Sequence, residues 1–281
     1  MIRIVTDSTC DLPPEMYREY DITVVPINIQ FGTQSYLDGV TIDGPAFFQM
    51  VRHLGILPKT SQPSVGQFTD AYLRLVEEGF TGIVSIHCTA RLSGTYQSSV
   101  MAANLLGTRA DIHPFDSAAG SAGLGFMVME AAQMARAGAG MPEILARLEE
   151  IRSRLVLVFT VRDLRYAQLS GRVGKLQGSL ASLLSVKPVI QLDQGVIDVS
   201  DMVRSRSRSL DRLLQIVVEA VGTVQPVNIA AVHALAKEEA QAQLDRFRAV
   251  CRVRESFVSD LALSLAVHFG PGTVGLIAYR V

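Results

Sequence analysis

The sequence predicts an α/β protein of two domains. The first is expected to hold a doubly wound, mostly parallel sheet, and the second an α+β arrangement with a mixed or antiparallel sheet. Short β-branched runs alternate with helical runs through the first half of the chain. In the second half, β-rich runs at 187–192 and 196–203 flank Asp193-Gln194-Gly195, a spacing typical of an antiparallel hairpin. The 281 residues, 48% of them hydrophobic, suffice for two compact cores.

The first domain opens with an expected strand at 2–6, a helix at 13–20 and a second β-rich stretch at 22–31. Strand, turn, helix and strand in this order begin a doubly wound sheet, whose ligands lie beyond the carboxyl ends of the strands. Asp7 and Ser8 follow the first strand directly. Their side chains are therefore expected either to cap the next turn or to lie near a cleft.

The remaining elements follow from the same patterns, with a domain boundary that divides the chain into 1–155 and 156–281. Ser64 is the expected cap of the helix that follows it. The expected helices of the first domain lie within 39–57, at 67–77, at 98–106, up to 137 and at 142–152, with strands at 82–86 and 111–115. In the second domain we expect strands at 155–161, 187–192, 196–203, 227–233 and 275–279, with helices at 210–221 and 238–249.

Composition excludes several classes of function. A net charge of −1 supplies no basic field for nucleic acid phosphates. The cysteines Cys10, Cys88 and Cys251 are isolated, which fits neither a disulfide framework nor a zinc site and indicates a reducing cytoplasm. The sequence shows no signal-type segment and no apolar run near the roughly 20 residues of a membrane span. We therefore expect a soluble, cytoplasmic protein without bound metal, nucleic acid partner or integral membrane segment.

The turn between the strand at 82–86 and the helix at 98–106 ends in Ser93-Gly94-Thr95. A serine at a helix start can cap its own backbone, or it can offer its hydroxyl beside the free N–H groups to a bound anion. Gly94 favours the second role, because a missing side chain lets a ligand approach the backbone. Both roles remain open at this level.

Other candidate residues lie in predicted loops. Thr60 and Ser61 come shortly before a proline and are expected in a loop, with side chains on opposite sides. Arg172 is flanked by glycines, so its guanidinium could fork onto a carboxylate or phosphate, or simply be exposed. His268 precedes a Gly-Pro-Gly turn and could donate to an oxyanion or fill a structural role. Arg204 begins an alternating Arg-Ser run, typical of a solvated face or of a surface for an acidic partner.

Two catalytic readings are weak. A hydrolase would need Ser93 as nucleophile, His87 or His268 as base and Asp116 as acid, but the turn lacks the leading glycine of G-x-S-x-G. The glycines of 120–125 have the spacing G-x-x-G-x-G and indicate close helix packing instead of a dinucleotide loop. No phosphate-binding G-x-x-x-x-G-K-[ST] loop occurs. Phosphoryl chemistry would therefore need ATP and magnesium from another protein.

Motifs along almost the whole chain resemble those of one family. They are I-V-T-D-S-T-C-D-L from Ile4, S-Y-L-D-G-V from Ser35, K-T-S-Q-P-S from Lys59, S-G-T-Y-Q from Ser93, D-S from Asp116, G-R-V-G-K from Gly171, K-P-V-I from Lys187, V-R-S-R from Val203 and H-F-G-P-G-T-V-G-L from His268. In this order they resemble the DegV family, whose members bind a long-chain fatty acid. Some members serve as the acyl-carrying subunit of bacterial fatty acid kinase.

This resemblance implies two α/β domains with the acyl chain in an apolar tunnel at their junction. Thr60 and Ser93 match the hydroxyls that bind the fatty acid carboxylate, and Ser61 and Gly94 adjoin them. His268 matches a position beside the carboxylate. The implied ligand is thus a long-chain fatty acid, and the protein itself needs no cofactor.

The resemblance also implies a soluble partner kinase that carries ATP and magnesium and phosphorylates the bound acid to an acyl phosphate. Arg172 and His268 match positions that assist phosphoryl transfer, and Arg172 and Arg204 match positions that face the kinase. The protein would then be a non-catalytic carrier subunit. Two alternatives are an acyl hydrolase or transferase that uses Ser93, and a fatty-acid sensor or store without a kinase.

Some residues depart from the family pattern. Arg91 replaces a glycine of the serine loop, Ala262-Leu263 stands where Gly-Pro is common, and Phe269 follows the histidine in place of threonine. These departures concern the mouth of the pocket and the choice of ligand. The sequence leaves acyl chain length, unsaturation and oligomeric state open.

Overall fold

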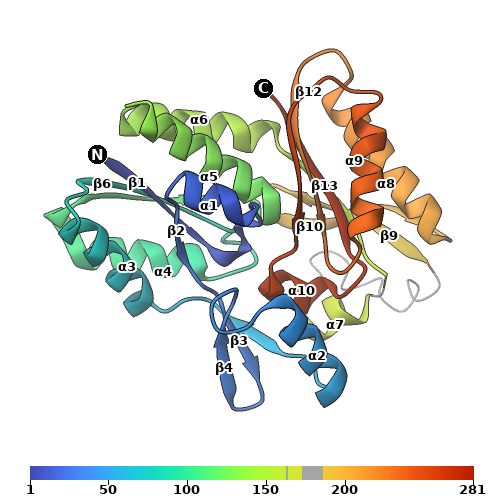
Figure 1. Ribbon diagram of the computed structural model, residues 1–281, viewed down its shortest axis with the longest axis horizontal. Helices are drawn as coiled ribbons and strands as arrows, with labels where there is room; N and C mark the ends of the chain where they lie inside the picture. Colours follow the sequence, from blue (N-terminus) through green and yellow to red (C-terminus); the bar gives the residue numbers. More distant parts are fainter. Residues whose placement is uncertain (163, 173–185) are drawn as a thin grey trace. The chain divides into compact units, whose positions relative to one another are not determined.

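The computed structural model describes residues 1–162, 164–172 and 186–281 (Figure 1). These residues form two compact units. The first unit comprises Met1–Ser153 and Ala262–Ser264, and the second comprises Arg154–Leu261 and Leu265–Val281. The fold is mixed α/β, as the sequence predicts, and each unit is described by itself below.

The first unit is built on a four-stranded parallel sheet with strand order β2-β1-β6-β7. The strands are β1 (Ile2–Asp7), β2 (Thr23–Val25), β6 (Gly82–His87) and β7 (Asp111–Asp116). The helices are α1 (Pro14–Glu19), α2 (Gly44–Leu54), α3 (Val65–Glu77), α4 (Thr95–Leu106), α5 (Ser121–Arg136) and α6 (Met141–Arg154), with the 3-10 turns η1 (Ser8–Cys10) and η2 (Gly107–Arg109). Because α3 and α4 cover one face of the sheet and α5 the other, the central strand β6 is buried throughout (Figure 1).

Helix α3 shows how local sequence sets these elements. Phe68, Tyr72 and Leu75 recur at helical spacing and are buried against the sheet. The Ser64 hydroxyl accepts a hydrogen bond from the Gln67 N–H, and the Gln67 side chain accepts one from the Ser64 N–H. This capping box confirms Ser64 as the predicted cap. The helix begins at Val65, two residues earlier than the apolar pattern indicates.

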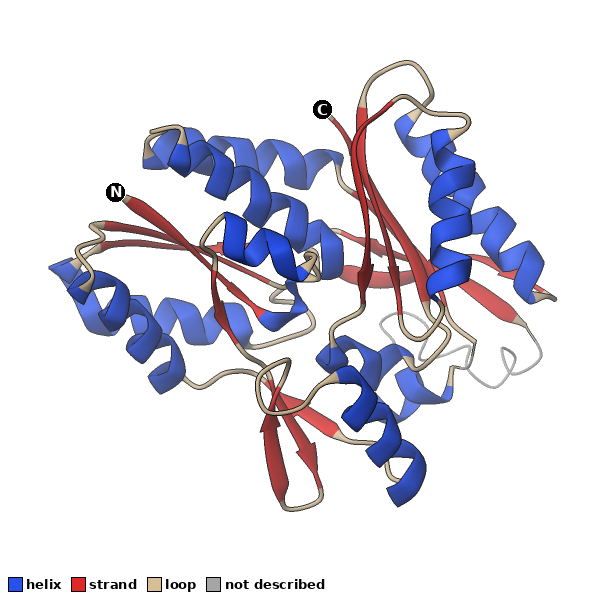
Figure 2. Cartoon of the chain, in the orientation of Figure 1, coloured by secondary structure: helices blue, strands red, loops and turns tan. Residues whose placement is uncertain are grey.

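A small antiparallel sheet was not predicted. It has the order β4-β3-β5, with strands β3 (Asn28–Phe31), β4 (Gln34–Leu37) and β5 (Lys59–Ser61) (Figure 2). The single β-rich stretch expected at 22–31 is therefore two strands in different sheets, interrupted at Pro26, which has no N–H to donate to a ladder. The expected loop at Thr60 and Ser61 is wrong, because both residues pair with β3.

The second unit contains a six-stranded mixed sheet with the order β10-β9-β8-β13-β11-β12, in which only β11 and β12 pair in parallel among the described strands. The strands are β8 (Val156–Thr160), β9 (Lys187–Asp193), β10 (Val196–Val203), β11 (Val227–His233), β12 (Val253–Asp260) and β13 (Val274–Arg280). The helices are α7 (Arg165–Ser170), α8 (Arg206–Val221), α9 (Lys237–Arg248) and α10 (Leu263–Phe269).

The predicted hairpin joins β9 and β10. Asp193 pairs with Val196, and the two turn residues Gln194 and Gly195 have φ values of 46° and 78°. Positive φ at both turn positions matches the right-handed twist of the flanking strands. The local signal in the sequence was therefore sufficient to place this turn.

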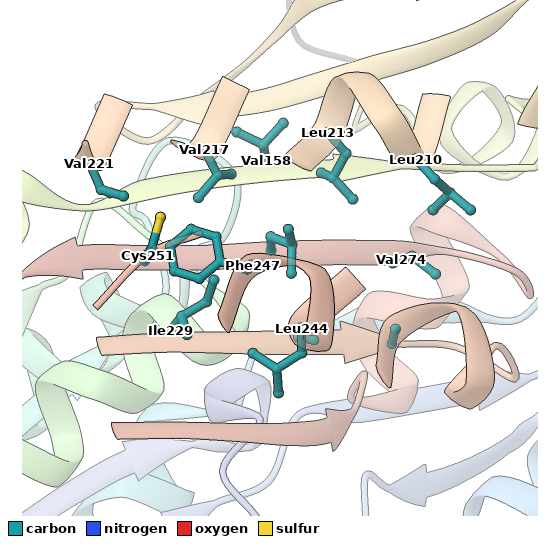
Figure 3. Close-up of a cluster of buried hydrophobic side chains, with 14 of the residues drawn as sticks. Val158, Leu210, Leu213, Val217, Val221, Ile229, Leu244, Phe247, Cys251 and Val274 are labelled. Carbon is teal, nitrogen blue, oxygen red and sulfur yellow. The ribbon is translucent and has the colours of Figure 1, made fainter. Parts of the chain in front are cut away.

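Helices α8 and α9 pack on the second sheet around a continuous apolar core (Figure 3). Leu213 and Val217 of α8 contribute to it, as does Phe247 of α9. Helix α8 starts four residues before the expected 210, because Ser205 caps a first turn without apolar residues by accepting a bond from the Arg208 N–H. Strand β12 was not predicted. It lies at the sheet edge, and its few apolar residues are interspersed with polar ones.

Of the glycines at 120–125, Gly125 packs closely, as predicted, and Gly120 does not. A Cβ placed on Gly125 would lie 2.5 Å from the Cys10 carbonyl oxygen, whereas one placed on Gly120 would meet nothing within 4 Å.

We expect Gly125→Ala to lower the free energy of unfolding by about 2 kcal/mol or more, although alanine favours a helix by about 1 kcal/mol. Gly120→Ala is the matched control and should change little. Urea denaturation measures both, and equal stability of the two variants would contradict the packing role.

Candidate ligand-binding site

The loop after β6 delivers Ser93 to the start of helix α4. The Thr89 carbonyl accepts hydrogen bonds from the N–H groups of Leu92 and Ser93, both at 3.2 Å, which makes the loop a compact turn. Helix α4 begins at Thr95, and its N-cap residue Gly94 supplies no side-chain cap. The first N–H groups of a helix have no acceptor within the helix. The helix start therefore combines N–H donors with the half-buried Ser93 hydroxyl.

The Ser93 side chain has a local role as well. Its Oγ accepts a hydrogen bond from the Thr95 N–H at 3.2 Å and lies 2.8 Å from Thr95 Oγ1. The local bond expected from a serine at a helix start is thus present. It occupies one lone pair of Ser93 Oγ, so that the hydroxyl retains capacity for a ligand.

The residue that follows strand β5 contacts this turn. A Cβ placed on Gly94 would lie 2.8 Å from the Gln62 side-chain nitrogen, so the Gln62 amide packs against Gly94. The Gln62 carbonyl accepts a hydrogen bond from the Asn28 side chain at 3.1 Å. This contact brings the end of β5, with Thr60 and Ser61, to the start of α4.

Strand alternation separates the two hydroxyl residues. Thr60 pairs with the fully buried Ile29, and Ser61 pairs with Asn28. Paired residues share a face of a sheet, and successive residues point to opposite faces. Thr60 is half-buried, whereas Ser61 is exposed. One face of β5 therefore presents Thr60 and the other presents Ser61, in agreement with the predicted opposite orientation.

A buried carboxylate fixes the start of the serine loop. Asp7, at the end of β1, accepts hydrogen bonds from the Thr9 N–H and the Cys88 N–H, both at 3.0 Å, and from His87 Nδ1 at 3.2 Å. Burial raises the pKa of Asp7, but the hydrogen bonds and charge of His87 and the bonds of Thr9 and Cys88 outweigh it, so the pKa is lowered. An ionised Asp7 thus holds β1, β6 and the loop together.

A chain of polar groups continues from Asp7 into the core. His87 Nε2 lies 2.7 Å from Ser85 Oγ, and the Tyr72 hydroxyl donates to Ser85 Oγ at 2.7 Å. Ser85, His87 and Asp7 have the connectivity of a Ser-His-Asp triad, but each is fully buried and out of reach of a substrate. Since both ring nitrogens of His87 have these partners, the ring is not available as a base for Ser93.

Asp116, the other proposed partner of Ser93, also has a structural role. Its Oδ1 accepts hydrogen bonds from the Ala90 N–H at 3.2 Å and the Ala118 N–H at 2.9 Å. These bonds tie the serine loop to the end of β7. The departure at Arg91 leaves this turn intact, because the Arg91 N–H bonds to Thr89 Oγ1 and its side chain is exposed.

In the second unit, the structure brings Arg172 and His268 together. His268 lies on α10 and is only 9% exposed. Burial, and next the charge of Arg172, lower the pKa of His268 to about 4, so the imidazole is neutral near pH 7. Arg172 follows the helix-ending Gly171 and donates to the Ser170 carbonyl at 2.9 Å. The residues 173–175 that complete this motif lie outside the described residues.

The structure also gives the surroundings of Phe269, which departs from the family pattern, and of the basic residues Arg204 and Arg206. The ring of Phe269 packs edge-on against Phe159, with centroids 4.7 Å apart. Arg204 is exposed between β10 and α8. Arg206, two residues later, is not part of a solvated face, because it bonds to Glu239 and to the Gly272 carbonyl.

Two buried carboxylates that the sequence did not single out bind backbone N–H groups of residues 262–264, where α10 begins. Asp11 accepts a hydrogen bond from the Ala262 N–H at 2.8 Å, and Asp38 accepts one from the Ser264 N–H at 3.1 Å. The Ser8 hydroxyl also donates to Asp38, at 3.0 Å, which gives Ser8 a structural partner. Burial raises the pKa of both carboxyls. Both acids thus fix the segment 262–264, which belongs to the first unit, to its N-terminal residues.

Within the described ranges, no three or more His, Cys, Asp or Glu side chains are grouped to hold a metal ion. The helices of the described part of the chain are each too short or too polar to cross a membrane. The donors at the start of α4 are hydroxyl and backbone N–H groups, which suit an oxyanion such as a carboxylate.

The fold and these groups define an α/β protein with a candidate anion site in its first unit. Comparison with known proteins gives the family: the DegV family model matches residues 1–281, and the chain belongs to the DegV family. Protein DegV of Bacillus subtilis is 32% identical over 276 residues, which is 98% of each chain. A DegV family protein from Thermus thermophilus, solved for its fatty acid binding, has a TM-score of 0.92 and 30% identity over 100% of this chain and 99% of its own. A stearic-acid-binding protein from Eubacterium ventriosum has a TM-score of 0.92 and 28% identity over 100% and 98%.

The pair of Arg172 and His268 generates a pH prediction. Because the cation of Arg172 disfavours a second positive charge, we expect Arg172→Gln to raise the pKa of His268 from about 4 toward its usual value. Arg172→Lys keeps the charge and should leave the pKa low. NMR titration of the imidazole carbons measures this shift, with His268→Asn to assign the signal. An unchanged pKa in Arg172→Gln would show that burial alone neutralises the ring.

Proposed function

We propose that this protein binds a long-chain fatty acid and holds its carboxylate at Ser93 and Thr60. The observation that carries the proposal is the packing of Gln62 against Gly94, which sets the Thr60 strand beside the start of α4. Two proteins with the same fold support it: a DegV family protein from Thermus thermophilus that binds fatty acid, and a stearic-acid-binding protein from Eubacterium ventriosum. The donors at α4 suit the head group that such a ligand carries.

The two ends of the ligand contribute differently to binding. About 14 buried methylene groups at roughly 0.8 kcal/mol each give a gross transfer free energy on the order of 11 kcal/mol, before the cost of immobilising the chain. A charge-assisted hydrogen bond to the carboxylate adds roughly 1.5 to 3 kcal/mol. The tail therefore sets the affinity, and the hydroxyls set which end of the ligand lies at α4.

We further propose that the bound acid is presented to a soluble, cytoplasmic kinase that carries ATP and magnesium. A carboxylate oxygen would attack the γ-phosphorus of ATP, ADP would leave, and the product would be an acyl phosphate. Arg172 would offset the charge that develops on the phosphoryl group, while His268, neutral near pH 7, would act as an N–H donor. The exposed Arg204 would contact the kinase.

The binding class is tested by organic extraction of the purified protein and mass spectrometry of the extract, against a mock purification. A long-chain fatty acid in near-stoichiometric amount supports the proposal. An empty extract, together with no uptake of added fatty acid, contradicts it. Pull-down from the native cytosol then separates a kinase-linked carrier from a sensor or store, since only the carrier should yield acyl phosphate with ATP.

The head-group assignment leads to a mutational prediction. We expect Ser93→Ala and Thr60→Val each to weaken fatty acid binding about tenfold, because each removes one hydrogen bond to a charged group. Binding of the fatty alcohol with the same chain should change less, since its head group is uncharged. Calorimetry with both ligands measures the two effects.

Ser61→Ala is the matched control for Thr60→Val. It removes a hydroxyl from the opposite face of the same strand, so acid binding should stay within about twofold of the parent. A loss of acid binding in Ser61→Ala that equals the loss in Thr60→Val would mean that strand alternation does not select the ligand face.

A further inference from the structure

A serine that binds a carboxylate must have its one proton available. An ionised carboxylate only accepts hydrogen bonds, and a serine hydroxyl has one proton to donate. This requirement rests on the function proposed above. What directs the proton of Ser93 outward is therefore part of how the site works.

Thr95 is the residue that decides this direction. Its N–H donates to Ser93 Oγ at 3.2 Å, and its own Oγ1 lies 2.8 Å from the same oxygen. Two arrangements satisfy the second contact. If Ser93 donates to Thr95, the serine proton is consumed inside the protein. If Thr95 donates to Ser93, the serine proton is available to a ligand.

The surroundings of Thr95 favour donation from Thr95 to Ser93. Thr95 is fully buried at the first position of α4, and its β-branched side chain has little rotational freedom. Among the residues that the structure describes, the Thr95 hydroxyl is hydrogen-bonded to Ser93 Oγ, and the neighbouring polar group is the buried Cys88 thiol. Sulfur is a weak acceptor, so the Thr95 proton is better placed on the Ser93 oxygen.

The Cys88 thiol also favours donation from Thr95 to Ser93. It is buried and lies near the hydroxyls of Ser93, Thr95 and Thr9. Burial raises the pKa of this thiol, which keeps its proton in place as a weak donor. Thr9 donates its own proton to Asp7, which as a carboxylate only accepts. No thiolate therefore competes with the Ser93 oxygen for the Thr95 proton.

We propose that Thr95 is a positioning residue for head-group binding: it donates both its N–H and its hydroxyl to Ser93 Oγ and so turns the Ser93 proton toward the ligand carboxylate. Thr95 itself does not touch the ligand. The hydroxyls of Thr95 and Ser93 then form a chain in which each donates to the next, and such chains strengthen their terminal donor.

The test compares Thr95→Val, which removes the hydroxyl at nearly constant shape, with Thr95→Ser, which keeps it. Dissociation constants are measured for a long-chain fatty acid and for the fatty alcohol of equal length. We expect Thr95→Val to reduce the preference for acid over alcohol by about three- to tenfold, and Thr95→Ser to retain the parent preference. Circular dichroism and thermal melting check that both variants fold, and Thr95→Ala replaces Thr95→Val if the latter does not.

The sign of the change distinguishes the two arrangements. If Ser93 donates inward in the free protein, Thr95→Val releases its proton and acid binding tightens; that result, or an unchanged preference, overturns the inference. Ser93→Ala is measured in parallel. A preference that falls in Ser93→Ala but not in Thr95→Val rejects only the role of Thr95. A preference that Ser93→Ala leaves intact rejects the head-group assignment of the proposed function and the inference with it.

Discussion

The hydrogen bonds of one buried carboxylate determine where the serine loop can lie. Asp7 stands at the carboxyl end of β1 and binds groups of β6 and of the loop that follows it, about eighty positions away along the chain. Parallel strands bring these ends to one edge of the sheet, where unpaired backbone groups need partners. An ionised carboxylate with several donors meets that need and tolerates full burial. The loop from Cys88 to Ser93 is therefore held at its first residue by Asp7. The position of the start of α4, which follows this loop, thus depends on the sheet.

Much of the fold could be predicted because its signals are local. The capping box at Ser64, the turn at Gln194 and Gly195 and the buried strand before His87 each depend on a few neighbouring residues. The small sheet of β3, β4 and β5 could not be predicted, since its strands are short and β5 pairs across about thirty residues. Strand β12 could not be predicted for another reason. An edge strand need not be apolar, so its residues lack the hydrophobic pattern that identifies a buried strand.

In the candidate site too, some features could be predicted from local sequence and others only from the folded chain. Ser93 and Gly94 were accessible from sequence, because a helix start has a recognisable chemistry. The contact between Gln62 and Gly94 was not, because nothing local to either residue indicates the other. Strand pairing distinguishes Thr60 from Ser61, a choice that a loop would not have provided. The neutral state of His268 depends on burial and on the charge of Arg172, which only the folded chain creates. The ligand class itself came from the family resemblance and not from periodicity.

The bonds from Asp11 to Ala262 and from Asp38 to Ser264 span 251 and 226 positions of the chain. During synthesis, the residues of β1 and η1 emerge well before the backbone groups that donate to their neighbouring acids. The sheet of the first unit can form early, but Asp11 and Asp38 keep incomplete hydrogen bonding until residues 262–264 have been made. Completion of the first unit thus waits until most of the second unit has been synthesised, and a chain that stops short of residue 262 carries buried acids without their backbone partners.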